Sequence, residues 1–443
     1  MRTNVRHRGT RFSLLAVAAS LVLAPGAPAQ TFVASRDAPI PGQPKWIPSF
    51  AFPHSSPPAS DPKPWLAIDP FTSPEGYARA VLAYFMEGQN TSTWRVQNNP
   101  VRKWYHMPWM HLGSLGREVI HGLTRERNAS AGTLATTQHS CTQTWSIGFF
   151  NPIGGHQLWK IWNDGNSAPD FSSTPMPEGT VVVKLLFNEA SPTEVPYLKR
   201  SPTLKANVAK RPAGSAAGSC VDIGVTQRTP GTVRLVQLDI AVKDSRAPVT
   251  NWFFGTFVYR NEAPATKAWS RLVPVGLMWG NDPSLSDAGA QGGQAPTESV
   301  VLNTFGFTEK LGRGGRLNGP LDNRSSTCLS CHMTAQKPNS APLFHGAGWD
   351  TAKCWFRNLP PTQAFGDAPT ATTPCGHNDG SLQSFDFSLQ LQVGWRNWRS
   401  QHPGGPPAPP GPVPHAAIPV PAGGDPLLQP LIIDGRVSQP LVR

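Results

Sequence analysis

The chain has 443 residues and a formal net charge of +12. Its 48 prolines and 41 glycines stay below the share typical of a disordered chain, and its 15 tryptophans and 20 phenylalanines predict a substantial core. The basic residues are spread along the chain and form no stripe interleaved with aromatic residues, which argues against a nucleic-acid partner.

Residues 1–29 have the three parts of a secretory signal peptide. Four arginines and no acidic residue come first, an apolar run follows from Phe12 to Ala24, and Ala27-Pro28-Ala29 offers small residues for cleavage. The apolar run is too short to span a bilayer. We therefore expect a periplasmic or secreted protein with no transmembrane segment in the mature chain. Loss of the four arginines lowers the formal charge to about +8.

The next segments are an arm and a helix. Residues 30–72 are rich in proline and predict an extended arm on the surface. Residues 73–88 predict a helix, with Ser73 as its N-cap, Pro74 in its first turn and Gly88 at its end. Its apolar face is expected to contain Tyr77, Ala78, Val81, Leu82 and Phe85.

From about residue 145 the pattern is that of strands, rich in β-branched and aromatic residues and punctuated by glycine, proline and aspartate. In residues 234–242, Leu235, Gln237, Asp239 and Ala241 face one way, and the apolar residues between them face the other. This predicts an α+β fold, mainly one antiparallel sheet with a few helices and many loops. The predicted strands are residues 145–150, 157–162, 180–187, 232–242, 252–260, 271–280 and 299–305.

The C-terminal part is less regular. Residues 385–398 predict a last strand or a short helix, and residues 403–443 predict a disordered proline-rich tail. Residues 73–402 are therefore the expected folded domain, either as one unit or as two subdomains.

A cysteine motif follows the predicted sheet. Residues 325–336 read SSTCLSCHMTAQ and hold Cys328, Cys331 and His332 in the pattern C-x-x-C-H. Chance would produce this pattern only on the order of 0.002 times in such a chain. The pattern is that of covalent haem c attachment, in which the two thiols bind the haem vinyl groups and the adjacent histidine binds the iron. Export suits this chemistry, so we expect one covalent haem c.

The motif allows two other interpretations. A thioredoxin-like dithiol needs a βαβ setting, which is not visible here. A zinc site would need two more ligands, and the nearby residues that could supply them are Cys354, Cys375, His345 and His377. Their spacing is long, and thiols in an exported protein are prone to oxidation.

The remaining cysteines are Cys141, Cys220, Cys354 and Cys375, an even number in an oxidising compartment. The most natural pairing joins Cys354 to Cys375 and Cys141 to Cys220, although three connectivities are possible. Such bridges would stabilise a loop-rich region.

The sixth ligand of the iron decides whether the iron is closed or open to small molecules. Met333, the only methionine after the motif, lies next to His332 and cannot reach the other side of the same haem. Met278 is the preferred distal candidate, although a role in the core is the plainer interpretation. The other candidates are Met107, Met110, Met176, His106, His111, His121, His345 and His377.

Two stretches carry a resemblance to a known family: MPEGTVVVKLLFNEA at 176–190 and STCLSCHMTAQ at 326–336. Together they resemble the periplasmic hydroxylamine-oxidising cytochromes with a lysine-crosslinked haem, and the related cytochrome c′-beta. The resemblance implies an antiparallel sheet with helices, an open distal side of the iron and, in one branch, a lysine bonded to the porphyrin. Lys184 is the matching lysine, but strand alternation allows it to point to solvent. More broadly, the chain resembles exported monohaem c-type cytochromes.

Two functions follow from this. The first is electron transfer through the haem to a redox partner, for which the basic exterior favours an acidic protein. The alternative is an open-site haem enzyme or gas-binding protein that acts on nitric oxide, hydroxylamine or peroxide. In that case Arg313, Arg316 or Arg324 would pair with the haem propionates.

Overall fold

The computed structural model describes most of the chain between residues 39 and 402, together with residue 35 and four residues near the C-terminus. The described residues are 35, 39–57, 61–110, 116–163, 168–209, 228–265, 267–302, 311–343, 348–366, 375–376, 380–402, 432–433 and 436–437.

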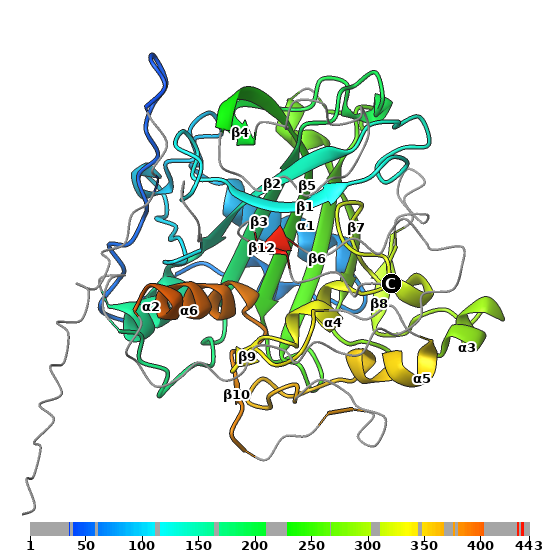
Figure 1. Cartoon of the computed structure of the whole chain (residues 1–443). Helices are drawn as coiled ribbons and strands as arrows, with labels where there is room; N and C mark the ends of the chain where they lie inside the picture. Colours follow the sequence, from blue (N-terminus) through cyan, green and yellow to red (C-terminus); the bar gives the residue numbers. More distant parts are fainter. Residues whose placement is uncertain are drawn as a thin grey trace, which may run out of the picture.

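The fold is α+β and is built on one antiparallel sheet of eight strands, as predicted (Figure 1). The strand order is β1-β2-β3-β5-β6-β7-β8, and β4 pairs with the N-terminal part of β5. The strands are β1 (Thr124–Ala129), β2 (Thr142–Phe150), β3 (Val181–Asn188), β4 (Thr203–Ala209), β5 (Arg228–Lys243), β6 (Trp252–Tyr259), β7 (Leu272–Met278) and β8 (Ser299–Val301).

The two faces of the sheet differ in chemistry. Helix α1 (Pro74–Met86) covers the apolar face, where Phe85 packs on Phe149 and Tyr77 on Phe253. Helices α4 (Cys328–His332) and α6 (Leu389–Gln401) lie over the other face, in front of the sheet in Figure 1. The predicted alternation of β5 is confirmed, because Gln237 and Asp239 share a hydrogen bond on the α4 face. The C-x-x-C-H motif therefore lies over the polar side of the sheet.

Helix α1 forms where the sequence predicts it. Ser73 precedes it, Pro74 occupies its first position, and Gly88 follows it with a φ of 72°, a value that glycine adopts without strain. Its buried residues are Tyr77, Ala78, Val81, Tyr84 and Phe85, whereas the predicted Leu82 is only partly buried.

Residues 157–162 were predicted as a strand, and this prediction is wrong: they form the end of helix α2 (Pro152–Trp162). The side chain of Asn151 caps this helix by accepting a hydrogen bond from the backbone N–H of Gly154. Leu158, Ile161 and Trp162 are buried at helical spacing. Their aromatic and β-branched character favours a strand, but the Asn151 cap and the helical spacing of the buried residues stabilise a helix instead.

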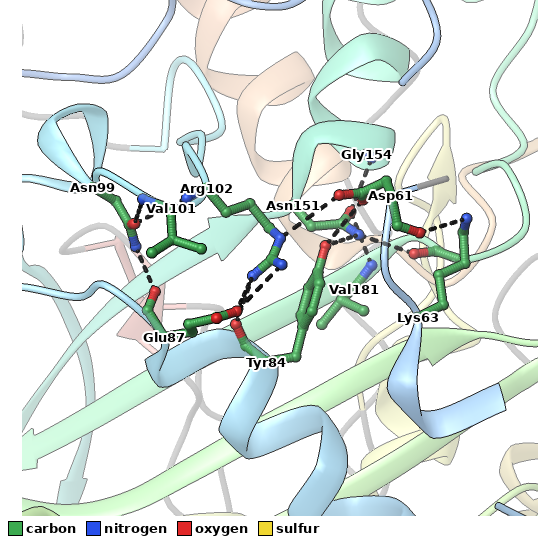
Figure 2. A network of polar contacts seen from close by, with 11 residues as sticks. Asp61, Lys63, Tyr84, Glu87, Asn99, Val101, Arg102, Asn151, Gly154 and Val181 are labelled. Atoms are coloured by element: carbon green, nitrogen blue, oxygen red, sulfur yellow. Dashed lines mark hydrogen bonds and ion pairs between the residues drawn. The ribbon is translucent and has the colours of Figure 1, made fainter. Parts of the chain in front are cut away.

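Asn151 also belongs to a polar network that joins distant parts of the chain (Figure 2). Its side chain accepts a hydrogen bond from the N–H of Val181 at 3.1 Å and donates to the carbonyl of Gly179 at 2.9 Å. In the same network Arg102 lies 3.7 Å from the centre of the Tyr84 ring and donates to the Tyr84 carbonyl at 3.0 Å. The network fixes the ends of α1 and α2 against the start of β3.

The described part of the proline-rich arm is more than a surface segment. It has little regular structure apart from a 3-10 helix at Pro64–Ala67, as its composition predicts. It nevertheless buries Trp46, Phe52 and Trp65 almost completely. These large apolar side chains anchor the arm in the core.

Between β7 and α6 the described helices and strands are short. For residues 385–398 the sequence predicts a strand or a short helix; residues 389–398 belong to α6, and residues 385–388 precede it, with Ser388 as the N-cap. None of the described helices is long and apolar enough to cross a bilayer. The other elements are α3 (Asp287–Gln291), α5 (Trp349–Ala352), β9 (Gln336–Lys337), β10 (Gln383–Ser384), β11 (Ile432–Ile433), β12 (Arg436–Val437) and 3-10 helices at Val96–Asn98, Pro196–Leu198, Ala268–Arg271, Arg313–Gly315 and Lys353–Phe356.

Candidate functional site

The motif forms the short helix α4, and local sequence explains why it is helical. Thr327 and Ser330 make a capping box: the Thr327 hydroxyl accepts from the Ser330 N–H at 2.9 Å, and the Ser330 hydroxyl accepts from the Thr327 N–H at 2.8 Å. Helical spacing then places Cys328, Cys331 and His332 on one side of α4. These three residues are partly accessible, whereas Leu329 and Ser330 are buried.

Asn281, which follows the end of β7, holds helix α4 through hydrogen bonds of its side chain. Its side-chain oxygen accepts a hydrogen bond from the Thr327 hydroxyl at 2.9 Å, and its side-chain nitrogen donates to the carbonyl of Arg357 at 2.9 Å. The same nitrogen lies 3.6 Å from the sulfur of Met333. The position of α4 is therefore set by contacts outside the motif.

Both thiols of the motif are free. The sulfur of Cys328 lies 3.7 Å from the hydroxyl of Thr256 on β6. Burial raises the pKa of Cys328 well above its usual value and raises the pKa of Cys331 to about 12. A redox-active dithiol has a lowered thiol pKa, so this environment does not favour a thioredoxin-like role.

The imidazole of His332 is held in one orientation. Because a carbonyl oxygen only accepts hydrogen bonds, Nδ1 carries the proton and donates to the carbonyl of Phe387 at 2.8 Å. The Phe254 ring packs on the imidazole with 4.9 Å between centroids. Burial lowers the pKa of His332 to about 4, so the ring is neutral at pH 7. Its Nε2 lone pair is thus free to bind a metal.

Beside the motif, the centre of the sheet keeps an accessible area. Val182, Lys184, Asp239 and Ala241 are partly accessible, whereas the residues that alternate with them on β3 and β5 are buried. They form two register pairs, Lys184 with Asp239 and Val182 with Ala241. We call these four residues the central patch.

The central patch adjoins the motif through β6. Thr256 is the register partner of Asp239, and Phe254 is the register partner of Ala241. Thr256 lies against the sulfur of Cys328, and Phe254 lies against the ring of His332. The accessible side chains of α4 and the accessible centre of the sheet are therefore neighbours.

Five charged side chains meet around the central patch, and we call them the charged cluster: Glu126, Arg127, Lys184, Asp239 and Asp322. Lys184 forms an ion pair with Glu126 at 2.9 Å and retains 35% of its side-chain exposure. It does not extend freely into solvent, as strand alternation alone suggested. Burial opposes the charge on Lys184, but the carboxylates of Glu126, Asp322 and Asp239 together outweigh it and raise the Lys184 pKa.

The two aspartates of the charged cluster share one donor group. The side-chain nitrogen of Gln237 lies 2.9 Å from both carboxylate oxygens of Asp239 and 2.7 Å from one oxygen of Asp322. Burial, followed by the charge of Asp322, raises the pKa of Asp239 to about 8. Burial also raises the pKa of Asp322. At neutral pH one proton is therefore held by this pair.

Arg127 is the unusual member of the charged cluster. Its residue is 5% exposed, and within the described part of the chain its Nη1 has no hydrogen-bond partner. Burial lowers its pKa, while the charges of Asp322 and Cys331 act in the opposite direction. A buried guanidinium with an unused donor is suited to an anionic group such as a haem propionate.

These observations test whether the residues present fit a haem. Two free thiols, a neutral histidine with an available Nε2 and a buried guanidinium with one unused donor lie around one accessible area. This donor set suits haem c, with Cys328 and Cys331 for attachment and His332 for the iron.

The preferred distal candidate, Met278, is the last residue of β7 and is fully buried. Its register partner is Phe254, so Met278 lies on the same face of the sheet as the motif. The structure thus places Met278 one strand beyond the phenylalanine that contacts His332.

Among the other candidates, the two described histidines make their contacts away from the motif. His106 contacts Trp46 and Phe149, and the latter packs against α1 on the opposite face. His121 is hydrogen-bonded through Nε2 to the carbonyl of Lys205 on β4. Met107, Met110 and Met176 are buried. The remaining candidates, His111, His345 and His377, lie outside the described residues.

Two of the three arginines suggested for the propionates are engaged elsewhere. Arg316 is fully buried and donates to the carbonyls of Asn281, Asp282 and Leu285, and Arg313 pairs with Asp287. Arg324 is close enough to Arg127 for its charge to lower the pKa of Arg127. Sequence reasoning missed Arg127, although the alternation of charges in residues 124–127 was a signal of a polar strand.

The predicted disulfide between Cys354 and Cys375 is confirmed. These two sulfurs are therefore not available as zinc ligands. Among the described residues, no group of three or more His, Cys, Asp and Glu side chains is arranged to hold a metal ion. Cys141 is disulfide-bonded, while its predicted partner Cys220 lies outside the described residues.

Comparisons of this chain with protein-family models, with curated proteins and with solved structures find no match.

Proposed function

We propose that this protein is an exported monohaem c-type cytochrome, with haem attached through Cys328 and Cys331 and its iron bound by His332. One observation carries the proposal: the hydrogen bond from Nδ1 of His332 to the carbonyl of Phe387, which leaves Nε2 available on the same helix as two free thiols. Histidines that bind metals usually donate their other ring nitrogen to such an acceptor.

The chain's own residues would divide the work of holding the group. Cys328 and Cys331 provide the sulfur atoms, and the buried ring of Phe254 excludes water from one side of His332. Arg127 offers its unused Nη1 to a propionate, and Lys184 adds a second positive charge at the same place. Haem supplies one-electron chemistry at iron when it is bound.

Electron transfer is the function we propose first, because it requires only attachment and one axial ligand. Without residues 1–29 the chain carries a formal charge of about +8, which would speed encounters with an acidic redox partner. Such steering weakens as salt is added, so the rate of electron exchange with an acidic partner should fall with ionic strength.

The charged cluster favours a second candidate function, that of an open-site haem enzyme or gas-binding protein acting on nitric oxide, hydroxylamine or peroxide. Reactions of these molecules move protons as well as electrons. Asp239 and Asp322, bridged by Gln237, hold a proton close to Cys328. An electron carrier has no need for such a pair.

An absorption spectrum of the exported full chain, ferric and then reduced, with and without carbon monoxide, tests both candidates. Production should use cells that carry out haem c maturation, with the C328S/C331S double variant as the control. A haem that survives denaturation in the parent and is lost in the control supports the proposal. Absence of covalent haem in the parent overturns it.

The same spectra separate the two candidates. A low-spin reduced spectrum unaffected by carbon monoxide means a closed iron and supports electron transfer. A Met278→Ala variant that becomes high-spin would then identify Met278 as the ligand. A parent spectrum that is high-spin and shifts with carbon monoxide rejects the closed iron and places the open-site function first.

A further inference from the structure

The carboxylate of Asp386 lies at the centre of a buried set of contacts behind the motif. Lys243 on β5 donates to both of its oxygens, at 2.8 and 2.9 Å. The indole nitrogen of Trp252 donates at 2.7 Å, and the backbone N–H of Met176 donates at 2.6 Å. Asp386 is fully buried. The ion pair, two neutral donors and complete burial fix this residue in place.

The backbone at this point adopts an unfavourable conformation. Asp386 has a φ of 48° and the next residue, Phe387, has a φ of 61°. Two successive left-handed residues without a glycine are uncommon, and a bulky residue such as phenylalanine is a clear outlier there. Such a turn persists only where the surroundings determine it. The contacts of Asp386 are the surroundings that hold this turn.

The turn has a specific effect on the motif. It directs the carbonyl of Phe387 toward His332, which donates from Nδ1 at 2.8 Å across 55 positions of sequence. An extended backbone at residues 386–387 would point this carbonyl elsewhere. The orientation and the tautomer of His332 therefore depend on a residue that does not touch it.

We propose that Asp386, held by Lys243 and Trp252, is a positioning residue for His332 and tunes the ligand strength of its Nε2. The inference rests on the proposed function, in which Nε2 binds the iron. A firm acceptor at Nδ1 makes the imidazole a stronger electron donor, which stabilises ferric iron and lowers the reduction potential. Loosening the turn weakens that acceptor.

The chain offers a matched control for this inference. Asp244, next to Lys243 in sequence, is also a buried carboxylate, paired with Arg246 at 2.6 Å and hydrogen-bonded by Tyr77 of α1 at 2.9 Å. Its contacts lie on the α1 side of the sheet and do not involve residues 386–387. Asp386→Asn and Asp244→Asn thus remove the same charge in similar surroundings, but only the first weakens the hold on the turn.

The experiment compares the two variants with the parent in haem-loaded and haem-free form. In the loaded protein, we expect D386N to raise the reduction potential. Where the reduced iron is five-coordinate, D386N should also lower the iron–histidine stretching frequency in resonance Raman spectra. D244N should leave both unchanged, although both variants lower Tm. Lys243→Met should shift the potential in the same direction as D386N. Equal effects of D386N and D244N on all readouts would reduce Asp386 to a stability role and overturn the inference.

A second measurement keeps the inference testable if no haem is bound. Nitrogen-15 spectra of the histidine side chains in the haem-free C328S/C331S protein, with His332→Gln to assign the signal, report the tautomer of His332. We expect Nδ1–H to dominate, and D386N to reduce its ratio to Nε2–H by about tenfold, as loss of one hydrogen bond would. An unchanged ratio overturns the inference independently of haem binding, whereas missing haem with a changed ratio would reject only the proposed function.

Discussion

Lys184 and Asp239 stand directly opposite each other on β3 and β5, and the ammonium group of Lys184 is bonded to Glu126 at 2.9 Å. Asp239 therefore shares the ammonium group of Lys184 with another carboxylate, and it also faces Asp322 across Gln237. Burial and the charge of Asp322 keep Asp239 protonated to a pH of about 8. This makes the centre of the sheet sensitive to pH.

Replacing Asp239 with asparagine should flatten the dependence of stability on pH. The pKa of Asp239 is about 8 when folded and near 3.8 when unfolded. Between these two pH values the folded protein binds a proton that the unfolded chain does not bind. The stabilisation that this proton provides is complete below about pH 4 and is lost as the pH rises to about 8. Asp239→Asn should consequently gain stability relative to the parent at pH 9. Urea unfolding at pH 5 and pH 9 measures this, with the exposed Asp350→Asn as control. Parallel curves for D239N and the parent would contradict the prediction.

His106 should make the protein sensitive to acid. Burial, followed by the charge of Arg117, lowers its pKa from 6.5 to about 3. The unfolded chain then takes up a proton first, so stability falls as pH drops from 6.5 toward 3. The loss at pH 4 is up to about 3 kcal/mol.

His106→Asn tests this, because asparagine can still donate to the carbonyl of Gly148, as Nδ1 does at 3.1 Å. We expect the variant to be less stable at pH 7 and to lose less stability between pH 6.5 and pH 4. The exposed His139→Asn is the control. An unchanged acid slope in H106N would show that another group causes the acid sensitivity.

Arg127→Met should have opposite effects with and without haem. Without haem, the substitution removes a buried charge with an unused donor, so the free energy of unfolding should stay the same or rise by about 1 kcal/mol. During haem loading, the propionate loses a partner, and the haem-bound fraction should fall. Thermal unfolding of the C328S/C331S form and haem content of the exported protein measure the two effects. A strong loss of stability without haem would mean that Arg127 is structural.

Removing the disulfide between Cys354 and Cys375 should lower the free energy of unfolding by about 3 kcal/mol. The bridge closes a loop with a sequence separation of 21, and the loss of this constraint increases the entropy of the unfolded chain. The double variant C354A/C375A, compared with the parent in urea, gives the value. A cost under about 1 kcal/mol would show that the packing around fully buried Cys354 holds the loop without the bridge.

Asn151→Ala should cost about 2–3 kcal/mol. The substitution removes the cap of α2 and leaves the N–H of Val181 without its acceptor in a buried place. Ser286→Ala is a matched control, because Ser286 caps the short helix α3, which has no buried residues. It should cost under about 1 kcal/mol. Equal costs for the two variants would mean that the network in Figure 2 adds nothing beyond the cap.

Local sequence was enough for the parts of the fold that depend on neighbouring residues. The proline and glycine at the ends of α1 mark that helix, and the alternation in β5 predicts which side chains share a face. The same local reasoning failed at residues 157–162, where strand-like composition was overruled by a cap and a tertiary network at Asn151. Strand β1 was missed because nearly all its residues are polar, whereas β4 was missed although polar and apolar side chains alternate over residues 203–208.

The sequence by itself determined the motif, its helical spacing and the expectation of haem, because C-x-x-C-H is a local pattern. Only the tertiary structure decided what surrounds it. The charged cluster joins β1, β3, β5 and residue 322. The acceptor of His332 is the carbonyl of Phe387, and the neighbouring Asp386 is held by Lys243 across 143 positions. Hydrogen bonds and charges between such distant residues depend on how the chain folds back on itself, and no local pattern records that path.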